Sequence, residues 1–151
     1  MILSGETIKK YVREGLFEIN PFSEKNLKGA SYTFTLDSKL LRLRDGQKLL
    51  RADKKPDYEE IEISNDGYIL KPGEFILGFT KEKLKLNDKF ACSLSSRGSC
   101  AQIGLDILLG SSFAEPDTNN SQTLEIFNVS GSSIVLFRDM PIVKGIFIPI
   151  D

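Results

Sequence analysis

The sequence Tyr68-Ile69-Leu70-Lys71-Pro72-Gly73-Glu74-Phe75-Ile76-Leu77-Gly78-Phe79 contains two short apolar runs separated by a turn, and this pattern decides the class of fold. The turn falls at Lys71–Gly73, because proline fixes its own backbone angle φ and glycine tolerates a positive one. The runs on either side, Tyr68–Leu70 and Phe75–Phe79, are rich in aromatic and branched side chains, which favour strands. The stretch therefore predicts two β-strands joined by a turn.

Short strands and turn signals recur on both sides of this stretch. Tyr32, Phe34 and Leu36 alternate with threonines, as in a half-buried strand, and Asp45-Gly46 is typical of a tight turn. Further strands are expected in five apolar segments, which are residues 90–94, 103–109, 123–129, 133–137 and 142–150. Strands at intervals of about ten residues, with turn residues between them, predict an all-β sandwich or barrel.

The remaining segments are charged or helical. Residues 51–60 and 81–89 carry many charges, and we expect both to be solvent-exposed. Ser4 is a suitable N-cap and Gly15 a suitable stop for a short helix between them, with Ile8 and its neighbours on one apolar face. No repeat or linker divides the chain, so we expect residues 1–151 to form a single domain.

Composition excludes several classes of protein. The 151 residues hold 20 basic and 21 acidic side chains, and this balance does not favour a nucleic-acid partner, which usually requires a basic excess. No apolar run reaches the roughly 18 residues of a membrane span, so no membrane partner is expected. The first residues do not resemble a signal peptide, and we expect a cytoplasmic protein.

The absence of histidine restricts the chemistry further. It excludes Ser-His-Asp and Cys-His nucleophile systems, and also zinc sites of the His-Cys-Cys kind. Acid–base chemistry then falls to carboxylates, lysine, tyrosine or a bound water. Cys92 and Cys100 are expected to be reduced, buried apolar side chains.

Two segments can bind or transform a ligand. Residues 95–101 place Arg97, Gly98 and Ser99 together, and such a stretch offers backbone N–H groups, a guanidinium and hydroxyls to an anion such as a triphosphate. An exposed polar turn is the alternative. Glu125 shares a strand face with Phe127, so a core or cavity facing Phe127 would also receive the carboxylate. An exposed sheet face is the alternative there.

A third polar segment, residues 113–121, contains Glu115 and Pro116 and is either a site or an ordinary hairpin loop. Together with the other two it belongs to a series of motifs in a fixed order: Met1–Ser4, Ile8–Tyr11, Ile19–Phe22, Ala30–Tyr32, Leu70–Leu77, Arg97–Ser99, Gly104-Leu105, Pro116, Glu125 and Asn128. This series resembles the dCTP deaminase and dUTPase family over nearly the whole chain, and more closely its deaminase branch. Leu70–Leu77 is similar to the family's central Pro-Gly-Glu hairpin.

The resemblance implies a mainly β fold, a distorted β-barrel of the dUTPase-like or β-clip type with a short N-terminal helix. It implies a homotrimer with active sites between subunits. The substrate would be a deoxynucleoside triphosphate, dCTP or dUTP, that carries Mg²⁺. The deaminases of this family need no zinc, and the resemblance gives the chain no metal-binding residues of its own.

The resemblance also assigns roles to residues. Glu125 matches the catalytic glutamate, which activates water for attack on C4 of cytosine and passes a proton to the leaving ammonia. The segment Arg97-Gly98-Ser99 matches triphosphate-binding positions. Ser111 aligns with a segment whose backbone contacts the base, and Glu115 with an aspartate that binds the sugar. Gln102 stands where the family has a second arginine that helps to stabilise the attacking water, and Gly98 stands where it has a serine.

Three hypotheses for function follow. The first is a zinc-independent dCTP deaminase that forms dUTP and ammonia, with Glu125 and Gln102 as catalytic residues. The second is a dUTP diphosphatase that forms dUMP and pyrophosphate, with Glu115 orienting water for attack on the α-phosphate. The third is a catalytically degenerate relative that binds a nucleotide or another protein, because several of the family's residues have changed.

Overall fold

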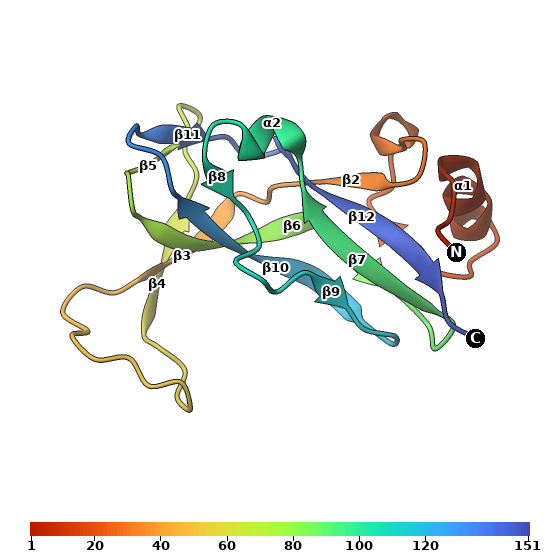
Figure 1. Cartoon of the computed structure of the whole chain (residues 1–151), viewed down its shortest axis with the longest axis horizontal. Coiled ribbons are helices and arrows are strands. Elements are labelled where there is room, and N and C mark those ends of the chain that lie inside the picture. The colour runs from red at the N-terminus through yellow and green to blue at the C-terminus, as the bar shows by residue number, and fades with distance from the viewer.

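The computed structural model describes residues 1–151 and shows a mainly β chain with a short helix at its N-terminal end (Figure 1). The elements in chain order are α1 (Gly5–Arg13), β1 (Glu18–Asn20), the 3₁₀ turn η1 (Glu24–Asn26), β2 (Tyr32–Thr35), β3 (Lys39–Leu43), β4 (Tyr58–Glu62), β5 (Tyr68–Leu70), β6 (Phe75–Lys85), β7 (Phe90–Ser96), α2 (Gly98–Ala101), β8 (Leu105–Asp106), β9 (Phe113–Ala114), β10 (Asn119–Asn128), β11 (Ile134–Leu136) and β12 (Pro141–Pro149). None of the helices has the length and apolar character needed to cross a lipid bilayer.

Two sheets enclose one hydrophobic core. The six-stranded sheet has the order β4-β3-β6-β10-β8, with β1 paired to β6, and the four-stranded sheet has the order β2-β12-β7-β9. Their inner faces contribute Ile76 and Ile126 from the first sheet and Phe34 and Phe147 from the second to a single cluster of 28 buried residues. The helix α1, the two-stranded sheet of β5 and β11, and several loops complete this cluster. The ladders do not close into a continuous ring, so the arrangement is a distorted barrel, and the predicted mainly β fold is confirmed.

The N-terminal helix forms as the sequence predicts. The Ser4 hydroxyl caps α1 by accepting a hydrogen bond from the Thr7 N–H at 3.1 Å, which satisfies one of the free donors of the first turn. Gly15 follows the helix with φ of 74°, a conformation that glycine adopts without steric cost. Ile8 is fully buried, so the apolar face of α1 packs against the core.

The turn at residues 71–74 does not make a hairpin between the strands that flank it. β5 pairs with β11, whereas β6 pairs with β1, β3 and β10, so the turn carries the chain from one sheet to another. The Glu74 carboxylate accepts hydrogen bonds from the Lys71 N–H, at 2.8 Å, and from the Tyr68 hydroxyl. The Gly73 N–H donates to the carbonyl oxygen of Asn128 at 2.9 Å. These contacts attach the turn to the end of β10 and separate the two strands.

Three local expectations are corrected by the structure. The predicted loop at 51–60 already contains the start of β4, which pairs with β3. The strand expected at 103–109 is only Leu105–Asp106, because the chain leaves the sheet after Asp106. Residues 81–85 are not merely solvated, since β6 continues through them with alternating burial. Pairing with β1 and β10 on both edges keeps this charged stretch in the sheet.

Glu82 is the clearest consequence of that alternation, because it is a buried carboxylate with an exposed fraction of 2%. Its oxygens accept hydrogen bonds from the Thr35 N–H at 2.9 Å and from the Thr35 hydroxyl at 2.7 Å. The register of β2 against β12 shifts between Pro141 and Val143, and Pro141, opposite Thr35, has no N–H. Glu82 thus supplies the acceptor for a backbone donor at this irregular point of the ladder.

We expect Glu82→Ala to lower the free energy of unfolding by about 1–3 kcal/mol, because the half-buried Thr35 N–H then lacks its acceptor. Glu82→Gln keeps an acceptor oxygen and should lose less. The exposed neighbour Lys83, which makes no ion pair, is the matched control, and Lys83→Ala should be near neutral. Urea unfolding of the three variants measures these differences. A Glu82→Ala protein as stable as wild type would contradict the role of this contact.

Candidate active site

The segment that resembles a triphosphate-binding motif forms one short helical turn after β7. Arg97 is the N-cap of α2, and Gln102 follows its last turn, where its N–H donates to the Gly98 carbonyl oxygen at 2.9 Å. Gly98, Ser99 and Gln102 are exposed. The N–H groups of Gly98 and Ser99 make no backbone hydrogen bond within the chain, so both remain available to an anion. The fold therefore gathers these four residues at one place.

Arg97 is a half-buried cation without a carboxylate partner. Its Nη1 donates to the Pro141 carbonyl oxygen at 3.2 Å, and no ion pair engages the guanidinium. The contact with Pro141 at the start of β12 holds one edge of the side chain and leaves other donors free for a ligand. Behind it, Cys100 is buried, and burial raises the pKa of its thiol. Cys92 is also buried and unpaired, which confirms the prediction for both cysteines.

Glu125 lies on the face of β10 that points away from the core. Leu124 and Ile126 are fully buried on the opposite face, as the alternation predicts. Glu125 stands directly opposite Leu77 of β6, and the neighbouring cross-strand pairs are Phe127 with Phe75 and Thr123 with Phe79. The carboxylate thus lies in a half-buried, apolar patch of the outer sheet face.

This environment withdraws one carboxylate oxygen from water. Oε2 of Glu125 is buried and has no hydrogen-bond partner. Burial raises the pKa of Glu125 above its ordinary value of 4.5, and the N–H of the same residue partly opposes the shift. A buried carboxylate oxygen without a donor is costly, and such groups are enriched at functional sites. The structure therefore favours a functional role for Glu125 over that of an ordinary solvated glutamate.

Ser111 and Glu115 lie on the segment that precedes β10. Ser111 is in the loop between β8 and β9, where its N–H donates to the Leu108 carbonyl oxygen at 2.7 Å. Glu115 is exposed in the turn that joins β9 to β10, and its carbonyl oxygen accepts from the Thr118 N–H at 3.2 Å. The two residues and Glu125 thus belong to one continuous stretch of chain, from the loop through the turn into the strand.

The single chain does not unite its candidate residues in one hydrogen-bonded site. Arg97 to Gln102 form the helical turn that follows β7 of the four-stranded sheet, whereas Glu125 lies in the six-stranded one. No hydrogen bond or ion pair joins Glu125 to any of the other candidates.

The sequence gives no reason to single out Asp106, although its side chain shapes the loop that carries Ser111. Its signal is weak, because an aspartate before apolar residues is common.

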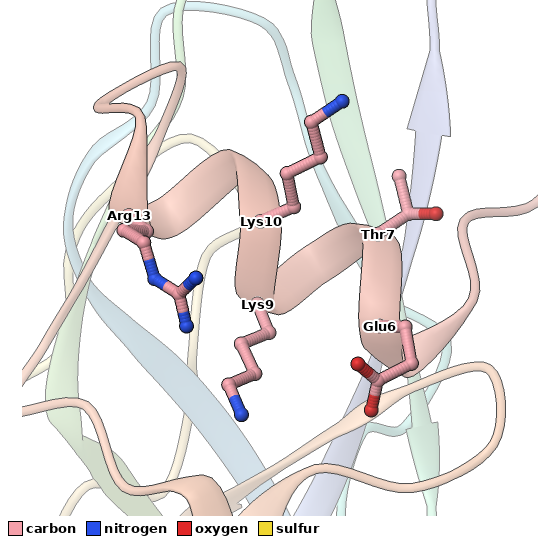
Figure 2. A pocket seen from close by; sticks show the side chains of 5 residues that line it. All are labelled: Glu6, Thr7, Lys9, Lys10 and Arg13. Atoms are coloured by element: carbon pink, nitrogen blue, oxygen red, sulfur yellow. The ribbon is translucent and has the colours of Figure 1, made fainter.

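A surface hollow with a volume of about 510 Å³ lies elsewhere, against α1. Glu6, Thr7, Lys9, Lys10 and Arg13 line it, and Figure 2 shows Lys9 and Lys10 projecting to opposite sides of the helix. Lys9 is paired with Glu24 at 3.1 Å. With no apolar wall, this open hollow is unsuited to holding a nucleobase.

Comparison with protein families decides the relationship. The family model described as dCTP deaminase-like matches residues 2–149. The chain belongs to the dCTP deaminase-like family. The predicted resemblance to this family is thereby confirmed. Arg97–Ser99 and Glu125 fall within the matched region.

Two curated relatives in this family carry the same name. The protein named "dCTP deaminase, dUMP-forming" from Sulfurihydrogenibium sp. is 28% identical over 97% of this chain and 83% of its own length. The protein of the same name from Beutenbergia cavernae is 31% identical over 94% of this chain and 76% of its own length. The similarity therefore covers most of the length of this chain and of both relatives. The name of the relatives specifies dUMP as their product.

Solved structures of the family share the fold. The 2'-deoxycytidine 5'-triphosphate deaminase from Agrobacterium tumefaciens superposes with a TM-score of 0.77 at 17% identity, over 97% of this chain and 47% of that longer one. The dUTPase from Streptococcus mutans gives a TM-score of 0.52 at 17% identity, over 88% of this chain and 94% of its own. At these identities the likeness establishes the dUTPase-like fold.

The environment of Glu125 predicts a specific titration. Because burial raises its pKa, the carboxylate should titrate with a midpoint above 4.5. Carbon-13 NMR of protein labelled at the glutamate carboxyl carbon measures this, and the spectrum of Glu125→Gln identifies the resonance by its loss. A midpoint at or below 4.5 would contradict a desolvated carboxylate.

Proposed function

We propose that this chain is a zinc-independent dCTP deaminase that replaces the amino group of cytosine by oxygen and releases ammonia. The observation that carries the proposal is the buried, unpartnered Oε2 of Glu125 in a largely apolar patch. The sequence resemblance matches this residue to the family's catalytic glutamate. A carboxylate with a raised pKa is suited to this reaction, because it must accept a proton from water and then return it near neutral pH.

The proton follows a balanced path. Glu125 takes a proton from a water molecule as the oxygen attacks C4 of cytosine, and the resulting tetrahedral carbon then loses its amino group. The same carboxyl group delivers that proton to the leaving nitrogen, and the proton of the new C4 hydroxyl passes to N3, so that ammonia departs and a uracil ring remains. Gln102 would donate a hydrogen bond to the attacking water. Its amide carries no charge, so it should stabilise the developing hydroxide less than an arginine would.

The triphosphate would bind at the exposed turn after β7. Arg97 offers a guanidinium that no carboxylate neutralises, and the free N–H groups of Gly98 and Ser99 lie beside it. Mg²⁺ would enter bound to the triphosphate, as part of the substrate. Glu115, one methylene longer than aspartate, would contact the sugar, and the loop containing Ser111 would contact the base.

The names of the relatives favour dUMP as the final product over the dUTP that deamination alone would give. Forming dUMP needs a second hydrolysis, in which water attacks the α-phosphate and pyrophosphate leaves. Glu115 is an exposed carboxylate on the same segment as Glu125 and would orient that water. We therefore propose that dCTP and two water molecules give dUMP, pyrophosphate and ammonia.

A homotrimer would complete this site. Within one chain the triphosphate-binding turn follows β7 of the four-stranded sheet, whereas Glu125 lies in the six-stranded sheet, and no hydrogen bond joins them. The patch around Glu125 also exposes part of several apolar side chains, including Leu41, Phe75 and Leu77, which a neighbouring subunit could cover. An interface between copies would bring the turn of one chain to the carboxylate of another.

The activity is tested by incubating the protein and Mg²⁺ with dCTP and following ammonia, pyrophosphate and the nucleotide product. We expect ammonia release, and Glu125→Gln should lower kcat by roughly 10²–10⁴-fold, the usual contribution of a positioned acid–base group. Glu62→Gln is the matched control, because Glu62 is exposed on β4 and makes no ion pair.

Other outcomes discriminate between the alternatives. Pyrophosphate from dUTP without ammonia from dCTP would indicate a diphosphatase alone. No product, together with a rise in melting temperature on adding dCTP or dUTP, would indicate a nucleotide-binding relative without activity. Full activity of Glu125→Gln would contradict the proposed mechanism.

A further inference from the structure

The loop that carries Ser111 begins where β8 stops early. Phe127 stands opposite Asp106 and Asn128 opposite Leu105 in the ladder between β8 and β10. If this antiparallel register continued, Leu108 would lie opposite Glu125. The apolar residues Ile107 to Leu109 would suit such a strand. The ladder ends after Asp106 nevertheless, so a local interaction must overrule the strand preference.

The side chain of Asp106 supplies that interaction. Its Oδ1 accepts hydrogen bonds from the Leu108 N–H at 3.1 Å and from the Leu109 N–H at 3.2 Å. An aspartate that binds the N–H groups two and three residues ahead forms a turn, and turns of this kind compete with strand pairing. The two N–H groups point to Asp106 and are not available to β10.

The loop that follows has an uncommon backbone conformation. Leu109 has φ of 34° and Gly110 has φ of 97°. A non-glycine residue with positive φ is strained and persists only where its surroundings fix it. The loop is fixed at its far end as well, because the Leu94 N–H of β7 donates to the Ser112 carbonyl oxygen at 2.7 Å. Asp106 therefore holds the near end of a loop that β7 holds at the other.

We infer that Asp106 is a positioning residue, which keeps the loop of residues 108–111 from pairing with β10. It thereby leaves room for the cytosine base beside Glu125, on the edge of β10 that faces away from β6. This inference rests on the proposed function, since it specifies how that site receives its base. Asp106 shares the outer sheet face with Phe127 and Glu125, but its carboxylate is committed to the loop. It acts on the substrate through the loop and not by contact.

The matched variants are Asp106→Ala, which removes the acceptor, and Asp106→Asn, whose side-chain oxygen can accept the same two hydrogen bonds. We expect Asp106→Ala to raise the KM for dCTP roughly tenfold with a smaller change in kcat, and Asp106→Asn to stay within about twofold of wild type. Asp66→Ala is the control, because Asp66 is exposed in the turn before β5 and makes no hydrogen bond.

Amide hydrogen exchange gives a second, activity-independent readout. Exchange at Leu108 and Leu109 should accelerate in Asp106→Ala and remain as in wild type in Asp106→Asn. A wild-type KM in Asp106→Ala, or an equal rise in both variants, would overturn the inference, and so would unchanged exchange in Asp106→Ala. If wild type releases no ammonia, the proposed function fails, and exchange alone then decides whether Asp106 holds the loop.

Discussion

The alternation of side chains along β10 is the constraint on which both the core and the candidate site depend. Leu124, Ile126 and Asn128 are fully buried on one face, so they fix which way the strand faces. A one-residue slip would place Glu125 in the core and expose its apolar neighbours. Asn128 strengthens the register, because its amide donates to the carbonyl oxygens of Leu70 and Ser132, at 3.0 and 2.7 Å. The position of Glu125 is thus set by residues that take no part in its chemistry.

The patch around Glu125 joins stability to function. Apolar side chains of β6 and β10 desolvate the carboxylate, and the fold tolerates this cost because the buried face of the same strands packs well. The consequence of this desolvation is that the pKa of the Glu125 carboxyl group is raised toward neutrality. A more polar patch would relieve the cost and remove the property that suits Glu125 to the proposed proton transfer. The apolar patch around Glu125 is therefore better explained by the proposed function than by a contribution to stability.

Local patterns in the sequence predict much of this fold. The period of two in Tyr32–Leu36 and around Glu125, and the cap and stop of α1, depend on neighbouring residues and are found where expected. Other features depend on contacts between distant segments. The pairing of β5 with β11, the buried contact of Glu82 with Thr35, and the early end of β8 at Asp106 each require a partner that local periodicity does not reveal. The resemblance likewise located Arg97 and Glu125, whereas their separation on two sheets became visible only in three dimensions.

The proposed function requires that Arg97 of one chain and Glu125 of another form a single site. Mixing two inactive variants tests it most directly. Arg97→Ala and Glu125→Gln proteins are each assayed alone, then dissociated together, reassembled, and checked for mixed trimers by native mass spectrometry. Ammonia release from dCTP should return in the mixed trimers, because some interfaces then combine an intact Arg97 with an intact Glu125. Mixed trimers that remain as inactive as the parent variants would contradict it.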